Sequence, residues 1–167
     1  MRHIPNFDIR YSEAKDFSYV NEWIYQPQIL QWFPMSTDKE VQDALACWMG
    51  FCRHKSSLTA TINGVPCGVV TLFLMPYRKV CHHCIFKIVV DPKYHHQGIG
   101  SSLIKNAKHL AKEYFRLERL QIEVIEGNHL IDLLKKQNFV EIVSQAKYFK
   151  EGDTYKGRVL LEVNLLQ

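Results

Sequence analysis

The sequence predicts an α/β fold in which one mixed β-sheet carries helices on both faces. Between residues 82 and 136, segments of strand pattern alternate with segments of helix pattern, and this order implies a parallel crossover. Hairpin-like pairs of strands precede and follow this stretch, which indicates antiparallel pairing at both ends of the sheet. In the expected strand 82–91, the stretch 85–90 is apolar on both faces apart from Lys87, as is typical of a central, covered strand.

The N-terminal part predicts one strand and two helices. Weak alternation at Phe7–Tyr11 indicates the opening strand, and residues 16–25 have an apolar face at helical spacing that ends before Pro27. The second helix has the better start signal, because Thr37 and Glu40 have the spacing of a capping box. Its apolar stripe consists of Val41, Leu45, Trp48, Met49 and Cys52.

The remaining elements follow from turn residues and periodicity. Ser57–Ile62 and 67–75 are expected to form a hairpin around Asn63-Gly64, a pair that suits a tight turn. Val65 and Pro66 indicate a longer loop there. The later elements are a helix at 100–116, a strand at 120–125, a short helix at 128–136, and a closing hairpin of 139–149 and 157–165.

Composition and charge narrow the class of protein. A chain of 167 residues without repeats or linkers is expected to form a single domain, 1–167. Its 21 basic and 17 acidic residues leave a mild net charge of +4 that is scattered along the chain, so nucleic acid is not an expected partner. No stretch approaches eighteen apolar residues, so a membrane is not an expected partner either. Residues 1–10 have no apolar leader segment, and the five cysteines are an odd number. A cytoplasmic protein with reduced thiols is expected.

The most informative segment joins the central strand to the strongest helix. Gly98 and Gly100 would let the backbone approach a ligand closely, and the free N–H groups of the first helical turn attract an anion such as a pyrophosphate. The dinucleotide-binding fingerprint is excluded because Leu103 replaces its third glycine, and the Gly-Lys-Ser/Thr of nucleotide hydrolases is missing. The alternative is an ordinary strand-to-helix turn.

This segment resembles the acetyl-CoA signature of the GNAT superfamily of N-acetyltransferases, Q/R-x-x-G-x-G/A after a strand that ends apolar-apolar-Val-x-Pro. Ile88-Val89-Val90-Asp91-Pro92 matches the strand end, and His96-Gln97-Gly98-Ile99-Gly100-Ser101 matches the turn, while His95 stands where the family prefers Gln or Arg. The resemblance covers nearly the whole chain. It implies a GNAT-like fold, a mostly antiparallel sheet with one splayed pair of parallel strands.

The resemblance also implies which residues bind acetyl-CoA as co-substrate. In the family, the end of the fourth strand pairs with the pantetheine arm, the turn holds the pyrophosphate, and an Asn before the next helix contacts the cofactor. The expected cofactor-binding residues are Ile88, Val89, Val90, His95, His96, Gln97, Gly98, Ile99, Gly100, Ser101 and Asn128.

Glu123 is the candidate catalytic base, since acetyl transfer requires an uncharged amine and ribosomal-protein alanine acetyltransferases place a base Glu at the matching point. The alternative is an exposed carboxylate, or an ion-pair partner of Arg119 or Lys87. The family's proton-donating Tyr corresponds to Leu134, so the proton donor is not identified. Tyr148 could substitute, and His82 and His83 could relay protons or be plain strand residues. Within the GNAT superfamily, the chain most resembles the ribosomal-protein alanine acetyltransferases.

Two further segments contain residues that could form a functional site. Cys81-His82-His83-Cys84 offers four potential zinc ligands, but neighbouring strand residues point to opposite faces, so no metal is expected. Residues 29–35 form an apolar, aromatic connection between the first two helices, where GNAT proteins often form the acceptor site.

The sequence therefore predicts an acetyl-CoA-dependent N-acetyltransferase that moves an acetyl group to a primary amine by direct transfer in a ternary complex. The acceptor would be a peptide or protein amine or a small-molecule amine, and the protein a monomer or homodimer. The alternative is a non-catalytic acyl-CoA-binding regulatory module on the same fold, a possibility raised by Leu134.

Overall fold

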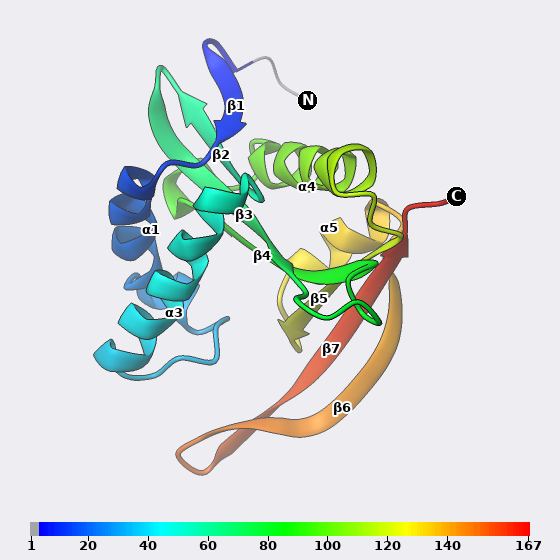
Figure 1. Ribbon diagram of the computed structural model, residues 1–167. Helices are drawn as coiled ribbons and strands as arrows, with labels where there is room; N and C mark the ends of the chain where they lie inside the picture. Colours follow the sequence, from blue (N-terminus) through cyan, green and yellow to red (C-terminus); the bar gives the residue numbers. More distant parts are fainter. Residues whose placement is uncertain (1–3) are drawn as a thin grey trace.

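A seven-stranded mixed sheet forms the centre of the computed structural model, which describes residues 4–167 (Figure 1). The strands lie in the order β1-β2-β3-β4-β5-β7-β6, and all neighbours are antiparallel except β4 and β5. The strands are β1 (Phe7–Tyr11), β2 (Ser57–Ile62), β3 (Val65–Leu74), β4 (His83–Val90), β5 (Arg119–Ile125), β6 (Val140–Glu151) and β7 (Thr154–Asn164).

Helices cover both faces of this sheet, as Figure 1 shows. One core cluster joins the sheet to α4 and α5, and a second joins β3 and β4 to α1 and α3. The helices are α1 (Phe17–Ile24), α2 (Pro27–Leu30), α3 (Asp38–Gly50), α4 (Ile99–His109) and α5 (Leu130–Lys136). The predicted fold class, a mixed sheet with one parallel pair and helices on both faces, is confirmed.

Most predicted elements lie within a few residues of their expected bounds, and two differ in an instructive way. The loop expected after Gly64 does not form, because Asn63 and Gly64 both have positive φ angles (51° and 78°) and close a two-residue turn. Pro66 fits within β3 beside an irregularity in the pairing with β2. The helix expected to end at Arg116 is α-helical only to His109 and continues as a π-helical turn, Leu110–Tyr114.

The capping box of α3 is present as predicted: Thr37 accepts a hydrogen bond from the Glu40 amide, and Glu40 accepts one from the Thr37 amide.

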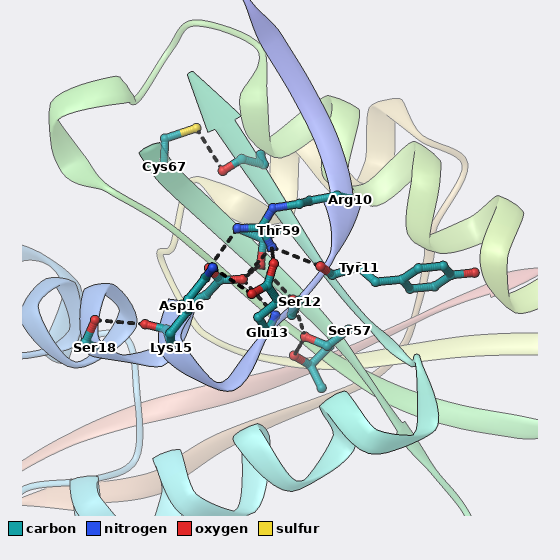
Figure 2. A network of polar contacts seen from close by, with 12 residues as sticks. Arg10, Tyr11, Ser12, Glu13, Lys15, Asp16, Ser18, Ser57, Thr59 and Cys67 are labelled. Atoms are coloured by element: carbon teal, nitrogen blue, oxygen red, sulfur yellow. Dashed lines mark hydrogen bonds and ion pairs between the residues drawn. The ribbon is translucent and has the colours of Figure 1, made fainter. Parts of the chain in front are cut away.

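A polar cluster that the sequence did not predict fixes β1 and the segment before α1 against β2 (Figure 2). Asp16, 1% exposed, accepts two hydrogen bonds from the Arg10 guanidinium (2.8 and 2.9 Å) and one each from the Glu13 amide (2.8 Å) and the Thr59 hydroxyl (2.9 Å).

Candidate active site

The site lies where the two parallel strands separate. β4 and β5 pair only at His83↔Arg119, Cys84↔Leu120 and Ile85↔Gln121. Beyond these pairs β4 stays paired with β3 as far as Val90, and β5 stays paired with β7 as far as Ile125. The gap between the strands opens into a cavity of about 880 Å³ whose walls come from β4, β5, the start of α4, α5 and the segment after α2. This is the splay that the resemblance implied.

The turn that was expected to bind phosphate has the required backbone geometry. Gly98 has a φ of +89°, a conformation that side chains disfavour, and it caps the start of α4. The first three residues of α4, Ile99, Gly100 and Ser101, belong to the cavity wall. A methyl group on Gly100 would lie 3.4 Å from Leu133 Cδ2, an ordinary contact, so internal packing does not require this glycine. Its lack of a side chain instead leaves room for a ligand at an electropositive helix end.

All but one of the residues expected to bind the cofactor line this cavity. The exception is Gln97, which does not belong to the cavity wall. A ring nitrogen of His95, Nε2, lies 2.9 Å from the Val90 carbonyl, so this side chain folds back on the end of β4. Asn128 Oδ1 accepts a hydrogen bond from the Leu130 amide (2.9 Å) and shapes the turn before α5.

Glu123 also lies in the cavity wall, on the side of the sheet that faces α1 and α3. Its carboxylate accepts a hydrogen bond from Arg158 Nη1 through Oε2 (2.9 Å), and the side chain stays 34% exposed. Arg158 in turn stacks on Tyr148, with its guanidinium carbon 4.1 Å from the ring centroid. The ion-pair partners weighed from the sequence were wrong, because Arg119 pairs with Glu162 and Lys87 forms no ion pair within residues 4–167.

Four other residues singled out from the sequence lie outside the cleft. Leu134 is fully buried in the core, while its neighbour Leu133 lines the cavity, so the expectation that Leu134 stands in the place of a proton donor does not hold. Neither leucine offers a hydroxyl. His83 is paired with Arg119 at the start of β4, His82 directly precedes this strand, and neither belongs to the cavity wall. Tyr148 is not part of the cavity wall.

The Cys81–Cys84 segment does not converge on one point. Cys84 is buried in the core, whereas Cys81 is exposed and donates a hydrogen bond to the Arg78 carbonyl. Within residues 4–167 no group of three or more His, Cys, Asp or Glu side chains is arranged to hold a metal ion. Over the same residues, no helix combines the length and apolar character needed to span a bilayer.

The opposite end of the cleft is aromatic and carries positive charge. Part of the segment 29–35 belongs to this wall, through Trp32, Phe33 and Pro34, and its role in binding the acceptor stays a prediction. Phe149 of β6 and Lys87 of β4 also line the cavity, and Lys156 Nζ lies 5.1 Å from the Trp32 ring centroid. The contributions of β6 and β7 were not found from the sequence, because they come from a long, curved hairpin (Figure 1) whose residues are far from Trp32 in the chain.

Comparison with known proteins agrees with this geometry. A family model described as acetyltransferase (GNAT) family matches residues 19–139. The L-amino acid N-acetyltransferase AaaT of Escherichia coli (strain K12) is 26% identical over 152 residues, which cover 88% of this chain and 91% of the relative. Among solved structures, a putative acetyltransferase of Salmonella typhimurium, determined with its cofactor acetyl-CoA, has a TM-score of 0.79 at 16% identity, covering 96% of this chain and 94% of the other. A ribosomal-protein-alanine N-acetyltransferase of Brucella melitensis has a TM-score of 0.79 at 16% identity, over 94% and 99% of the two chains.

Proposed function

Because the chain belongs to the acetyltransferase (GNAT) family and is an acetyl-CoA-dependent N-acetyltransferase, we propose that the cleft between β4 and β5 binds both substrates together. Acetyl-CoA supplies the activated acetyl group as a thioester. The observation that carries the proposal is the three-pair junction of β4 and β5, followed by a cavity that runs from the start of α4 to Glu123. A molecule that filled this cavity would contact both the start of α4 and the Glu123 carboxylate.

The residues of the chain would divide the work as follows. The free amides of Ile99, Gly100 and Ser101 would hold the pyrophosphate through hydrogen bonds and the helix dipole. The edge of β4 at Ile88–Val90 would align the pantetheine arm as an added strand, with Asn128 on the facing wall. His95 and His96 also line the cavity, whereas Gln97 does not. Direct transfer then requires only that the amine reach the thioester in the gap between the strands.

Glu123 would take the proton that the acceptor ammonium must lose before it can attack. Its position supports this role, because the carboxylate lies in the cavity wall and stays partly exposed. Arg158 holds Oε2 and so orients the carboxylate, while Oε1 has no hydrogen bond from residues 4–167. No dedicated acid is needed, since a thiol with a pKa of about 8.5 can leave as its thiolate. The position of Glu123 is the one feature for which the resemblance to ribosomal-protein alanine acetyltransferases supports a catalytic role.

The rival reading, a non-catalytic acyl-CoA-binding module, is not retained, because the family and the curated relative are enzymes. Its motive is also gone, since Leu134 is a core residue. The proposal takes residues 1–167 as one N-acetyltransferase domain that works in the cytoplasm, where the five cysteines, free in the structure, stay reduced.

The test is binding of acetyl-CoA, measured by thermal unfolding. At a hundredfold excess over Kd, binding stabilises the fold by about 2.7 kcal/mol, a rise in Tm of roughly 5–10 °C for a chain of this size. Ser101→Glu should abolish most of this rise, because it places a negative charge where the pyrophosphate would bind. Ser144→Glu is the matched control, since Ser144 is exposed on β6 and lies outside the cavity wall. An unchanged Tm in the parent protein, or equal shifts in both variants, would contradict the assignment of the site.

A further inference from the structure

Lys87 is a cation without an anionic partner in the wall of the cleft. It lies in the middle of β4, partly buried, with Nζ 5.3 Å from the Phe73 ring centroid and 5.8 Å from that of Trp48. No carboxylate of residues 4–167 forms an ion pair with it. Burial lowers the pKa of Lys87, and its electrostatic interactions, including that with Glu123, counteract this only in part. A buried cation without a partner destabilises the protein unless something else binds it.

The charges around Lys87 show what that partner would be. The acceptor end of the cleft has Lys87 in its wall, Lys156 over Trp32, and Arg158 bonded to Glu123. Among residues 4–167, Glu123 is the single carboxylate that forms an ion pair with any of these groups. This excess of positive charge repels an acceptor that carries only ammonium groups and favours one that also carries a negative charge.

The register of the strands sets the distance between the two charges that such an acceptor would meet. Ile85 is paired with Gln121, so Lys87 and Glu123 are each two residues further along their strands and point to the same side of the sheet. The strands have separated by this point, and the two side chains do not form an ion pair with each other. A cation and an anion therefore face one gap from opposite walls.

We propose that the acceptor is a zwitterionic amine of the α-amino acid type, whose carboxylate binds Lys87 while its amine points to Glu123. The aromatic wall of Trp32, Phe33 and Phe149 would contact the acceptor's side chain. This inference rests on the proposed function, because it names the acceptor for the same site. Lys87 is thus a residue that determines specificity.

The experiment compares acceptors that differ only in the carboxylate. CoA release is measured with a thiol reagent for L-phenylalanine, L-methionine and L-leucine, and for 2-phenylethylamine, 3-(methylthio)propylamine and 3-methylbutylamine. Lys87→Met should lower kcat/KM for the amino acids by roughly 10- to 100-fold, the range for a hydrogen bond to a charged group. For the three amines without a carboxylate, kcat/KM should change less than about threefold. Dividing variant by parent removes the differences in basicity between the amines. Lys105→Met, at an exposed position of α4, is the control for loss of a positive charge.

Each outcome decides the matter. Selective loss for the amino acids supports the inference. Equal loss in both series overturns the inference, because Lys87 would then act in the chemistry itself. Higher activity of the parent enzyme with the amines than with the amino acids also overturns it. If neither series releases CoA although acetyl-CoA raises Tm, the inference is wrong and the acceptor is an amine of another class; if acetyl-CoA does not raise Tm, the proposed site itself is wrong. Release from the amines alone overturns only the inference.

Discussion

Two arginine–carboxylate pairs in this molecule have similar hydrogen-bond lengths and opposite surroundings. At the start of the chain, Arg10 donates to both oxygens of Asp16, which also accepts from the Glu13 amide and Thr59 (Figure 2). In the cleft, Arg158 donates once to Glu123, at 2.9 Å. Asp16 is 1% exposed and Glu123 is 34% exposed. The first carboxylate is buried and accepts four hydrogen bonds, whereas the second has an oxygen, Oε1, without a hydrogen bond from residues 4–167.

The difference separates a structural carboxylate from a functional one. Burial would raise the pKa of Asp16, but the hydrogen bonds from Arg10, the Glu13 amide and Thr59 outweigh it and hold the pKa below its usual value. Asp16 therefore stays charged and fixes β1 and α1 to β2. Glu123 binds its arginine from one side only, which orients the carboxylate and leaves it accessible from the cavity. Three predictions test this contrast.

The largest effect is expected at Glu123. Glu123→Gln should lower kcat/KM near neutral pH by about 10²- to 10⁴-fold, the usual contribution of a general base. Activity should recover as pH rises, because the free amine then becomes abundant. The free energy of unfolding should change by less than about 1 kcal/mol, since the ion pair is partly exposed. Full activity of this variant at pH 7 with a basic amine would exclude Glu123 as the base.

The second effect, at Asp16, should appear in stability instead of activity. Asp16→Asn leaves Arg10 without its anion in a largely buried site, and we expect a loss of about 3 kcal/mol, the low end for such a pair because Arg10 is partly exposed. Tm should fall by roughly 6–12 °C, while kcat/KM of the folded enzyme stays within about twofold. Asp8→Asn, at an exposed position of β1, is the control and should change stability by less than about 0.5 kcal/mol. A similar loss in both variants would show that the network around Asp16 is not the cause.

The smallest expected effect is on the stability of the fold at acidic pH. A carboxylate whose pKa is lowered in the folded state stabilises the fold above its unfolded pKa of about 3.9, and this contribution is lost as pH falls through the lower folded value. Between about pH 5 and pH 2, the parent should therefore lose more stability than Asp16→Asn, as measured by chemical denaturation at each pH. If stability falls in parallel with pH in the two proteins, Asp16 is not the carboxylate that causes the loss of stability in acid.

The same contrast explains how much could be predicted from the sequence. Local signals predicted the first strand, the capping box at Thr37 and Glu40, and the Gly98 turn, because each depends on residues within a few positions of one another. The partner of Glu123 lies 35 positions away and that of Asp16 on β2 lies 43 away, so only the folded sheet brings them together. The prediction that Leu134 lies in the place of a proton donor was wrong for a related reason. A shift of one position around a short helix moves a side chain from the cleft into the core.

The short junction between β4 and β5 has a mechanical consequence. With three paired positions, the sheet consists of two halves, β1–β4 and β5-β7-β6, which share few backbone hydrogen bonds. A small rotation of one half against the other would widen the slot without breaking either half, at the cost of straining only those few bonds. A bound molecule that pairs with β4 and contacts β5 would join the halves across the slot. Amide protons along this edge of β4 would then exchange with solvent at rates that record how tightly the slot is closed.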